Sequence, residues 1–275
     1  MDLLIPEMII DEWLREDVGL FDLTTQALGI GDKEGMAEIM LREKGVLCGA
    51  REAARIYLKA GADEVEVAEE GVEEEGVVLR AVGRAEALHK AWRVAQNVVA
   101  LASGVATYTR KMVEAAKSIN PNVKVIVARK APPCRHLYYK GVICGGASLH
   151  RTSLSDTVIL FDNHTVFISF EEALRRLKNS DLVWDKKIVI EVDSVEKAVI
   201  AVKEGFEWIQ ADHLKPDELR TLYERVKSIN DRAKVIAAGG IKLENVKEYA
   251  FVDAILTSAP YWSKPLDATT KMAPL

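Results

Sequence analysis

The stretch "KIVIEVDSVEKAVIAVKEGFEWIQADH", residues 187–213, decides the fold class. Its two short apolar runs, "KIVIEV" and "EWIQA", flank a segment with helical periodicity, "SVEKAVIAVKEG". Neither run alternates cleanly between apolar and polar residues, as expected of strands that are buried on both faces of a parallel sheet. The stretch therefore predicts a strand–helix–strand unit with parallel strands.

Four more apolar runs of this kind occur beyond Pro121. They are "VKVIVA" from Val123, "TVILF" from Thr157, "KVIAA" from Lys234 and "DAILT" from Asp253. Six short buried strands, separated by loops and helices, predict an α/β barrel or an incomplete one.

The pattern before Pro121 is different. Residues 6–17 predict an amphipathic helix, and the segment "LFDLTT" predicts a loop. Short strands ("GMAEIMLRE", "DEVEVAEE" and "GVVLRAVG") surround one helix, "AREAARIYLKAG", as in an α+β layer. A long helix is expected from about Ala85 to Ser118, broken or bent near Ser103-Gly104.

The overall composition argues against several classes of protein. The formal charge of -5 and the pI near 5.7 disfavour a nucleic acid or an anionic membrane as partner, since either favours a basic surface. No apolar run approaches the roughly 20 residues of a membrane span, and no basic leader is present. The three cysteines have no Cys-x-x-Cys spacing and predict neither a disulfide framework nor a zinc site. We expect a soluble, cytoplasmic protein.

Each predicted strand beyond Pro121 is followed by polar residues or glycine. These are Arg129-Lys130, Asp162-Asn163-His164, Glu191 with Asp193, Asp212-His213, Gly239-Gly240 and Thr257-Ser258. Because the catalytic groups of α/β barrels gather at the carboxyl ends of the strands, we predict one shared site. Helix caps and turns are the alternative at any single strand end.

Five potential cations lie in the loops between the first two of these strands: Arg129, Lys130, Arg135, His150 and Arg151. In a chain of negative net charge they predict an anion site. Arginine offers a planar fork to carboxylate or phosphate, while lysine is a compact charge, so the mixture suits a ligand that carries both groups. Surface ion pairing is the alternative for Lys130 or Arg135 taken alone.

Glu191 and Asp212 supply the opposite charge. Carboxylates at this end of a barrel can hold Mg²⁺ or bind ribose hydroxyls. Asp193 ranks below them because it could cap the following helix instead.

Gly239-Gly240 precede a helix expected near Leu243, an arrangement in which backbone N–H groups receive a phosphate. The late strands of such barrels often bind phosphate, and Ser258 ends the last of them. Cations, acids and a phosphate turn together suggest a phosphorylated sugar that reacts with an anionic partner. No nucleophile paired with a base stands out.

Seven segments then resemble a known family in their order along the chain: "EDVGLFDLTT", "AWRVAQNVVALASGVATYTRKMV", "ARKAPPCR", "GGASLHRTSLSDTVILFDNH", "IEVDSVEKA", "QADH" and "AAGGI". Over nearly the whole chain they resemble quinolinate phosphoribosyltransferase, the nicotinate-nucleotide pyrophosphorylase of NAD synthesis. The resemblance implies the type II phosphoribosyltransferase fold, with an α/β sandwich domain over 1–104 and an incomplete parallel α/β barrel over 105–261. We expect the tail, 262–275, to pack back on the sandwich domain.

The resemblance also implies a reaction and an assembly. The pyridine nitrogen of quinolinate joins the anomeric carbon of phosphoribosyl pyrophosphate, with Mg²⁺ as cofactor and with loss of pyrophosphate and then carbon dioxide. The enzyme is implied to be a homodimer or a higher homo-oligomer in which the partner completes each site.

The implied roles can be carried over residue by residue. Arg93 matches the arginine contributed across the dimer. Arg129, His150 and Arg151 match the carboxylate-binding set, and Lys130 matches a lysine near the phosphoribosyl substrate. Glu191 and Asp212 match the acids at ribose and magnesium, and Gly239 and Gly240 match the 5′-phosphate turn. Ser258, at the last strand end, joins the predicted substrate-binding set.

Three positions depart from the pattern of the family. Phe161 stands where a lysine usually binds a quinolinate carboxylate, "APPCR" is one residue short with Cys134 in place of glycine, and Ile236 replaces an acid. Without the lysine, a second carboxylate loses a charge-assisted hydrogen bond of about 1.5–3 kcal/mol, which favours a different aromatic acceptor. Packing of the barrel is the alternative role of Phe161.

The segments "ALGIGDKEG", "VLCGAREAARIYL" and "ILTSAPYWSKPLD" look closer to the ModD branch, whose members are named for an association with molybdenum uptake, than to the NAD enzymes. Two functional hypotheses follow. The first is an Mg²⁺-dependent phosphoribosyltransferase that acts on a carboxylated nitrogen heterocycle. The second is a ModD-type protein with a different acceptor or with a non-catalytic, anion-binding role.

Overall fold

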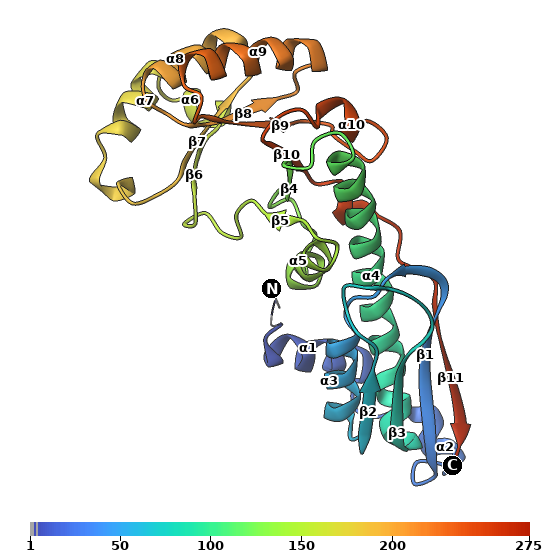
Figure 1. The fold of residues 1–275 in the computed structure, drawn as a ribbon. Helices are drawn as coiled ribbons and strands as arrows, with labels where there is room; N and C mark the ends of the chain where they lie inside the picture. Colours follow the sequence, from blue (N-terminus) through green and yellow to red (C-terminus); the bar gives the residue numbers. More distant parts are fainter. Residues whose placement is uncertain (1–2, 4) are drawn as a thin grey trace. The chain divides into compact units, whose positions relative to one another are not determined.

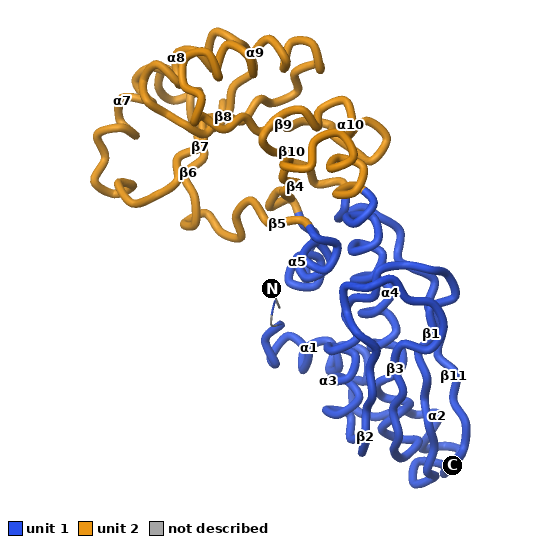
Figure 2. Tube along the Cα trace, viewed as in Figure 1, with its two compact units in different colours: residues 1–111, 131–146, 260–275 blue, residues 112–130, 147–259 orange. Residues whose placement is uncertain are grey.

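The computed structural model describes residue 3 and residues 5–275. The chain divides into two compact units (Figure 2), one of residues 1–111, 131–146 and 260–275 and one of residues 112–130 and 147–259. Each unit contains its own sheet, with strand order β11-β1-β3-β2 in the first and β5-β4-β10-β9-β8-β7-β6 in the second (Figure 1). We call them the antiparallel unit and the barrel unit.

The sheet of the antiparallel unit is built on β1 (Glu34–Val46). β3 (Glu73–Arg84) pairs with one edge of β1 and β11 (Ala268–Pro274) with the other, both antiparallel, and β2 (Glu64–Val67) pairs with β3. The last strand of the chain therefore belongs to the same sheet as the first. Apolar side chains of β1, β3 and the helices form one continuous core.

The helices of this unit differ from the sequence pattern at three points, one of which is that residues 135–144, expected to belong to a loop, form a helix. They are α1 (Glu7–Val18), α2 (Leu23–Leu28), α3 (Ala50–Ala60), α4 (Ala85–Lys117, which continues into the barrel unit) and α5 (Arg135–Cys144), and a 3-10 turn, η2, spans Ala259–Trp262. The segment "LFDLTT" was expected to be a loop, and that expectation was wrong. The Asp22 carboxylate accepts hydrogen bonds from the backbone N–H groups of Thr24 and Thr25 and so caps α2.

The third difference is that α4 is continuous where a break was expected. The Ser103 hydroxyl accepts a hydrogen bond from the Cys48 N–H (2.9 Å) and donates one to the Cys48 carbonyl (3.1 Å), so it ties the helix to the loop after β1. Gly104 is required for a close approach, because a Cβ there would overlap the Lys264 carbonyl oxygen. The Ser-Gly pair is therefore a packing device and not a helix breaker.

Gly104→Ala tests this packing. Alanine favours a helix over glycine by about 1 kcal/mol, so propensity alone predicts a stabler protein. We expect instead a loss of at least about 2 kcal/mol in the free energy of unfolding, because the added carbon would lie 2.9 Å from the Pro265 Cα and overlap Lys264. Urea denaturation followed by circular dichroism measures the change.

Gly31→Ala is the matched control, since its Cβ would meet Glu86 Cβ at an ordinary 3.6 Å. A stability within about 0.5 kcal/mol of the natural protein is expected for the control. Equal effects of the two substitutions would contradict the account of Gly104.

The barrel unit holds seven parallel strands. They are β4 (Lys124–Val127), β5 (Ser148–Leu149), β6 (Val158–Leu160), β7 (Ile188–Val192), β8 (Trp208–Asp212), β9 (Lys234–Ala238) and β10 (Ala254–Thr257). The sheet curls into a half-barrel (Figure 1). The expected class, α/β with an incomplete parallel barrel, is confirmed, and all six predicted strands are present. The seventh, β5, was missed because it has only two residues.

Helices follow the strands of the barrel unit, in the order α6 (Asp162–Thr165), α7 (Phe170–Lys178), η1 (Asp181–Val183), α8 (Val195–Lys203), α9 (Pro216–Ile229) and α10 (Val246–Tyr249). The strands also form a cluster of their own, with no helical residue in it. Its buried members are Ile159, Val189, Ile236, Ala238, Ala254 and Leu256, and Ile126, Ala128, Phe161 and Trp208 pack against them. We call the side of the sheet that carries this cluster the inner face.

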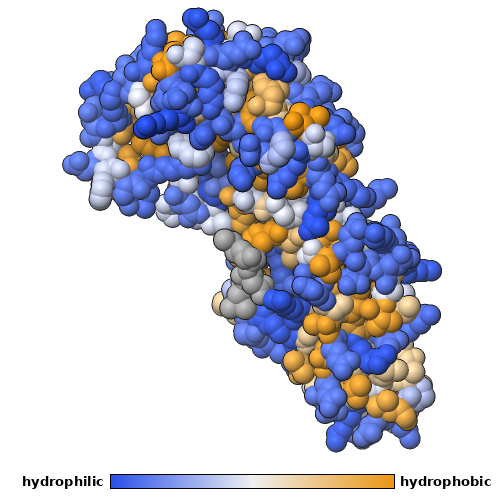
Figure 3. Space-filling model, viewed as in Figure 1, coloured by the Kyte–Doolittle hydropathy of each residue, from blue (hydrophilic) through white to orange (hydrophobic). Residues whose placement is uncertain are grey.

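No helix among the described residues is both long enough and apolar enough to cross a membrane. On the side of the molecule seen in Figure 3 most residues are hydrophilic, and apolar side chains gather mainly over the antiparallel unit.

Candidate active site

The inner face carries the predicted acids to one end of the half-barrel. Alternate residues of a strand point to the same side of a sheet, so Glu191 lies on the same face as Val189, and Gln210 and Asp212 on the same face as Trp208. Glu191 and Gln210 are register partners in the parallel ladder. Because the strands are parallel, Glu191 and Asp212 lie towards the same carboxyl end of the sheet, and Gln210 lies one step before it on the same face.

Glu191 and Asp212 are close enough to repel each other. Burial, and next the negative charge of Asp212, raise the pKa of Glu191 to about 7, while Lys130 acts in the opposite direction. The Gln210 side-chain amide donates a hydrogen bond to Glu191. The acids predicted from the sequence are therefore brought together, with Lys130 within electrostatic reach.

This pair fits a magnesium ion in one specific way. Among the described residues no group of three or more histidine, cysteine or acidic side chains could enclose a metal. Mg²⁺, however, is commonly held by one or two carboxylates together with phosphate oxygens of a substrate. Two carboxylates whose repulsion raises a pKa supply the protein's part of such a set, and a divalent ion between them would relieve the repulsion.

Asp193 lies beside these acids along the chain but is engaged elsewhere. Its carboxylate pairs with the Lys197 ammonium at 2.9 Å, and the same ammonium lies 3.4 Å from Asp162. The Ser194 hydroxyl, and not Asp193, accepts the capping hydrogen bond from the Lys197 N–H. Ranking Glu191 and Asp212 above Asp193 agrees with these contacts.

Four of the predicted cations belong to the barrel unit, and three of them, Arg129, His150 and Arg151, form a second group. The positive charge of Arg129 acts, after burial, to lower the pKa of Arg151, so the two guanidinium groups are near neighbours. Arg151 donates a hydrogen bond to the Thr157 carbonyl (3.2 Å), and the His150 N–H donates to the Val127 carbonyl (3.0 Å), which prolongs the pairing of β5 with β4. Arg135, by contrast, begins α5 in the antiparallel unit.

Two atoms of this group are buried without a hydrogen-bond partner: Arg129 Nε and His150 Nε2. Burial, and next the charges of Lys187 and Arg151, lower the pKa of His150 to about 4, so the imidazole is neutral at neutral pH. Buried polar atoms normally find partners. The unpaired Nε of Arg129, next to the Arg151 guanidinium, therefore indicates that a ligand completes the group. An anion would satisfy the arginines, and neutral His150 could add one hydrogen bond.

The depressed pKa of His150 predicts a pH-dependent stability. The folded protein binds this proton only near pH 4, whereas the unfolded chain binds it near pH 6.5. The contribution of His150 is therefore fully present above pH 6.5 and is lost as the pH falls towards 4, by about 1–3 kcal/mol. His150→Asn should flatten this part of the stability curve, measured by urea unfolding at stepped pH.

His213→Asn is the control, because His213 is exposed and asparagine tolerates its left-handed backbone (φ 56°). The control should keep the pH slope of the natural protein. An unchanged slope in His150→Asn would show that the imidazole is not buried as described.

Phe161 packs in the barrel, one of the two roles that the sequence left open, and also contacts a cation and a second ring. It packs against the apolar cluster of the inner face, as a barrel residue would. The Arg151 guanidinium also lies 5.6 Å from the centre of its ring, and the His164 ring stacks on it at 5.8 Å. The Phe161 N–H donates to His164 Nδ1 (3.0 Å), so the His164 imidazole is bonded within its own loop.

The Gly239-Gly240 turn has a backbone conformation that leaves room for another group to approach it. Both glycines have a positive φ, 88° and 68°, and a Cβ at Gly239 would collide with the backbone of His213, which donates to the Ala238 carbonyl. Nothing lies within 4 Å of a Cβ built at Gly240, so that side of the turn is open.

The helix expected near Leu243 was placed too early, since α10 begins only at Val246. The Asn245 side chain closes a turn before it, accepting from the Lys242 N–H (2.7 Å) and donating to the Gly240 carbonyl (3.3 Å). Any phosphate here would therefore meet turn amides and not the start of a long helix.

Thr257, which sequence reasoning did not select, attaches the end of β10 to this turn. Its buried hydroxyl donates to the Ile241 carbonyl (2.7 Å) and accepts from the Ala259 N–H (3.0 Å). Ser258, between them, is half-buried at the same strand end.

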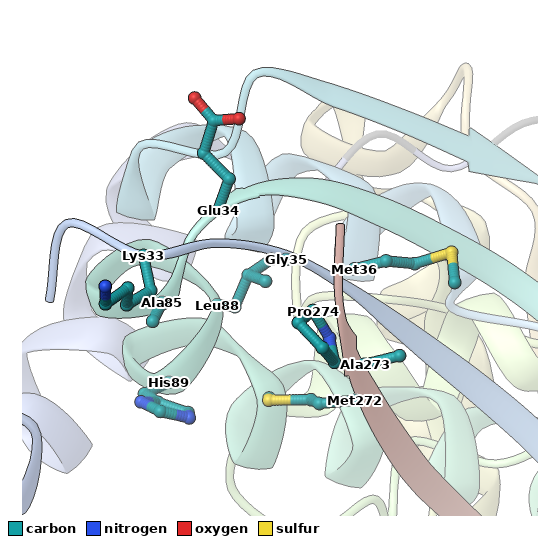
Figure 4. Close-up of a pocket in the computed structure, with 10 residues that line it drawn as sticks. All are labelled: Lys33, Glu34, Gly35, Met36, Ala85, Leu88, His89, Met272, Ala273 and Pro274. Atoms are coloured by element: carbon teal, nitrogen blue, oxygen red, sulfur yellow. The ribbon is translucent and has the colours of Figure 1, made fainter. Parts of the chain in front are cut away.

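Arg93 lies in the antiparallel unit, exposed on α4, with its guanidinium 3.9 Å from the ring centre of Trp92. That unit also has a hollow of about 220 Å³ (Figure 4), lined by Lys33, Glu34, Gly35, Met36, Ala85, Leu88, His89, Met272, Ala273 and Pro274. His89 Nδ1 is hydrogen-bonded to the Thr25 hydroxyl at 2.7 Å. No predicted site residue lines this hollow.

Comparison with known proteins identifies the class to which this fold and site belong. Residues 22–103 match the N-terminal domain and residues 105–270 the C-terminal domain of quinolinate phosphoribosyl transferase. The protein is thus a pentosyltransferase of the phosphoribosyltransferase class. The chain belongs to the quinolinate phosphoribosyltransferase family.

Relatives of two kinds are similar to this chain in sequence. The ModD protein of Rhodobacter capsulatus is 36% identical over 88% of this chain and 95% of its own length, and the ModD protein of Escherichia coli O6:H1 is 30% identical over 96% of each chain. A "Probable nicotinate-nucleotide pyrophosphorylase [carboxylating]" of Methanocaldococcus jannaschii is 32% identical over 88% of this chain and 87% of its own. Among solved structures, NadC from Streptococcus pyogenes superposes with a TM-score of 0.87 at 26% identity, over 99% of both chains.

Proposed function

We propose that the protein transfers the phosphoribosyl group of phosphoribosyl pyrophosphate to the ring nitrogen of a carboxylated heterocycle, with Mg²⁺ and with release of pyrophosphate. One observation carries the proposal: the barrel unit presents a pair of repelling carboxylates, Glu191 and Asp212, together with two neighbouring arginines, of which Arg129 has a buried donor without a partner. Metal-bound diphosphate and an anionic acceptor are the ligands that satisfy both pairs.

The chemistry follows from where charge develops. As pyrophosphate departs, the sugar becomes an oxocarbenium-like cation and the leaving group gains negative charge. Magnesium held by Glu191 and Asp212 would neutralise that leaving group when bound. Lys130, whose charge reaches Glu191, supplies further positive charge, and the open turn at Gly240 suits the sugar phosphate.

The acceptor is positioned by the second group. Arg129 and Arg151 bind its carboxylate, neutral His150 donates or accepts one hydrogen bond, and the ring of Phe161 offers an apolar face for an aromatic molecule. Holding the nitrogen in line with the anomeric carbon converts a reaction between two molecules into one within a complex. The reaction needs no side-chain nucleophile, which agrees with the absence of such a signal in the sequence.

The test begins with calorimetry of phosphoribosyl pyrophosphate and Mg²⁺, followed by pyrophosphate release with a panel of pyridine carboxylates. Arg151→Ala should lower kcat/KM for the best acceptor by about 100-fold, since a charge-assisted hydrogen bond is lost, and should leave phosphoribosyl pyrophosphate binding unchanged. Arg175→Ala, an exposed arginine on α7 that pairs with Glu172, is the control.

Unchanged activity in Arg151→Ala would remove Arg151 from acceptor binding. If the protein failed to bind phosphoribosyl pyrophosphate but bound molybdate, the transferase proposal would give way to the anion-binding alternative.

We also propose a homodimer in which Arg93 serves the site of the partner. Arg93 is exposed, and no described ion pair includes it. Several large apolar side chains of the antiparallel unit are strongly exposed, including Met8 (75%), Leu20 (95%) and Leu23 (70%), which favours self-association. The free thiols of Cys48, Cys134 and Cys144 support a reducing, cytoplasmic location.

Mixing two inactive variants tests the shared site. Arg93→Ala and Arg151→Ala should each be inactive, but subunit exchange creates heterodimers in which one site of the two keeps both arginines, so roughly a quarter of the activity should return. Equilibrium ultracentrifugation provides the assembly state. A monomer at micromolar concentration, or no recovery on mixing, would contradict the role of Arg93.

A further inference from the structure

Gln210 has a buried oxygen that nothing in the protein satisfies. It lies in the middle of β8 on the inner face and is 2% exposed. Its Nε2 donates to the Glu191 carboxylate, so the amide oxygen must find a different partner. Gln210 Oε1 is then left buried without a partner.

The neighbours of Gln210 explain why the oxygen is unpaired. In the parallel ladder its register partners are Glu191 on β7 and Ile236 on β9. Glu191 already receives the amide N–H, and Ile236 has no polar atom to offer. Trp208, two residues earlier on the same face, packs with Ile236 in the apolar cluster. Because neither adjacent strand provides a donor, the hydrogen-bonding capacity of this oxygen is unused.

The buried unpaired atoms of the barrel unit include both a donor and an acceptor of hydrogen bonds. Within the described residues of that unit they are Arg129 Nε, a donor, His150 Nε2, and Gln210 Oε1, an acceptor. A ligand that satisfied all three would carry an anionic or accepting group for Arg129 and a donating group for Gln210. A dicarboxylate such as quinolinate has no donor to offer to Gln210, and the inner face that carries Gln210 also carries the apolar side chains of Phe161 and Ile236, which cannot pair with a second carboxylate.

We propose that Gln210 selects the acceptor by accepting a hydrogen bond from it, so that the substrate is an aromatic nitrogen heterocycle with one carboxylate and one amino or hydroxyl group. This inference rests on the proposed transferase function and adds the substrate class. An otherwise unpaired buried acceptor discriminates by about 10-fold to 100-fold in favour of a ligand that pairs with it. A site built to pair with such a group also rejects the analogue that lacks it.

The experiment compares four probes in the presence of phosphoribosyl pyrophosphate and Mg²⁺: nicotinate, quinolinate, 2-aminonicotinate and 2-hydroxynicotinate. Dissociation constants come from calorimetry and turnover from pyrophosphate release. The natural protein should prefer the amino or the hydroxyl compound to nicotinate by at least about 10-fold, and quinolinate should rank last. Gln210→Leu should reduce that ratio to near one.

Using a ratio within each variant separates selection from general damage. Gln210→Leu also removes the hydrogen bond to Glu191, but a weakened Glu191 affects all four probes alike. Gln210→Met, unbranched and of similar length, should show the same loss of preference if Gln210→Leu fails to fold, and thermal unfolding identifies the folded variants.

Four outcomes would overturn the proposal, and the first three concern the measured preference. They are equal binding of all probes by the natural protein, a preference for quinolinate, and an unchanged ratio in the folded Gln210 variant, which would assign Oε1 to a buried water. Failure of every donor-bearing probe to bind would do the same. Failure to bind phosphoribosyl pyrophosphate would instead refute the transferase function. The two failures can be distinguished, because calorimetry with the heterocycles alone still measures the preference of the Gln210 site.

Discussion

The parallel direction of seven strands is the constraint from which the site follows. Parallel strands end at a common edge, so whatever polar residue ends each strand is brought beside its counterparts. In this protein the edge receives Glu191 and Asp212 from β7 and β8, and the shift in the pKa of Glu191 reports that they interact. Like charges held together in this way cost free energy in the absence of a ligand. That cost is what a divalent cation and a diphosphate would recover.

Arg129 and Arg151 form a second pair of like charges, positive in this case, whose repulsion a bound anion would relieve. The chain therefore keeps two unfavourable electrostatic groups within one unit, each of which a ligand of opposite charge would relieve. Buried donors without partners, at Arg129 and His150, add to the unfavourable terms of the ligand-free protein. Sites of this kind are recognised because they violate the rules that the rest of the fold obeys.

Much of this could be predicted from the sequence, because buried parallel strands have a simple pattern. The six apolar runs identify their own ends, and the ends identify Glu191, Asp212 and Gly239. What failed depended on single contacts between residues distant in sequence. Ser103-Gly104 has the composition of a helix break, but the contacts of Cys48 and Lys264 with α4 determine its role. The two-residue β5 has too little pattern to detect.

Gln210 shows why the rest of the site could not be found in this way. Within "EWIQA" a glutamine is an ordinary polar residue of a short strand, and no motif or spacing marks it. Its importance depends on Ile236, which follows at a sequence distance spanned by a whole helix and provides no donor in the adjacent register position. Ile236 stands where the family's pattern has an acid, so this face carries less negative charge and an apolar side chain beside the unpaired oxygen of Gln210. The smaller charge and the neutral acceptor together favour a less acidic acceptor than quinolinate.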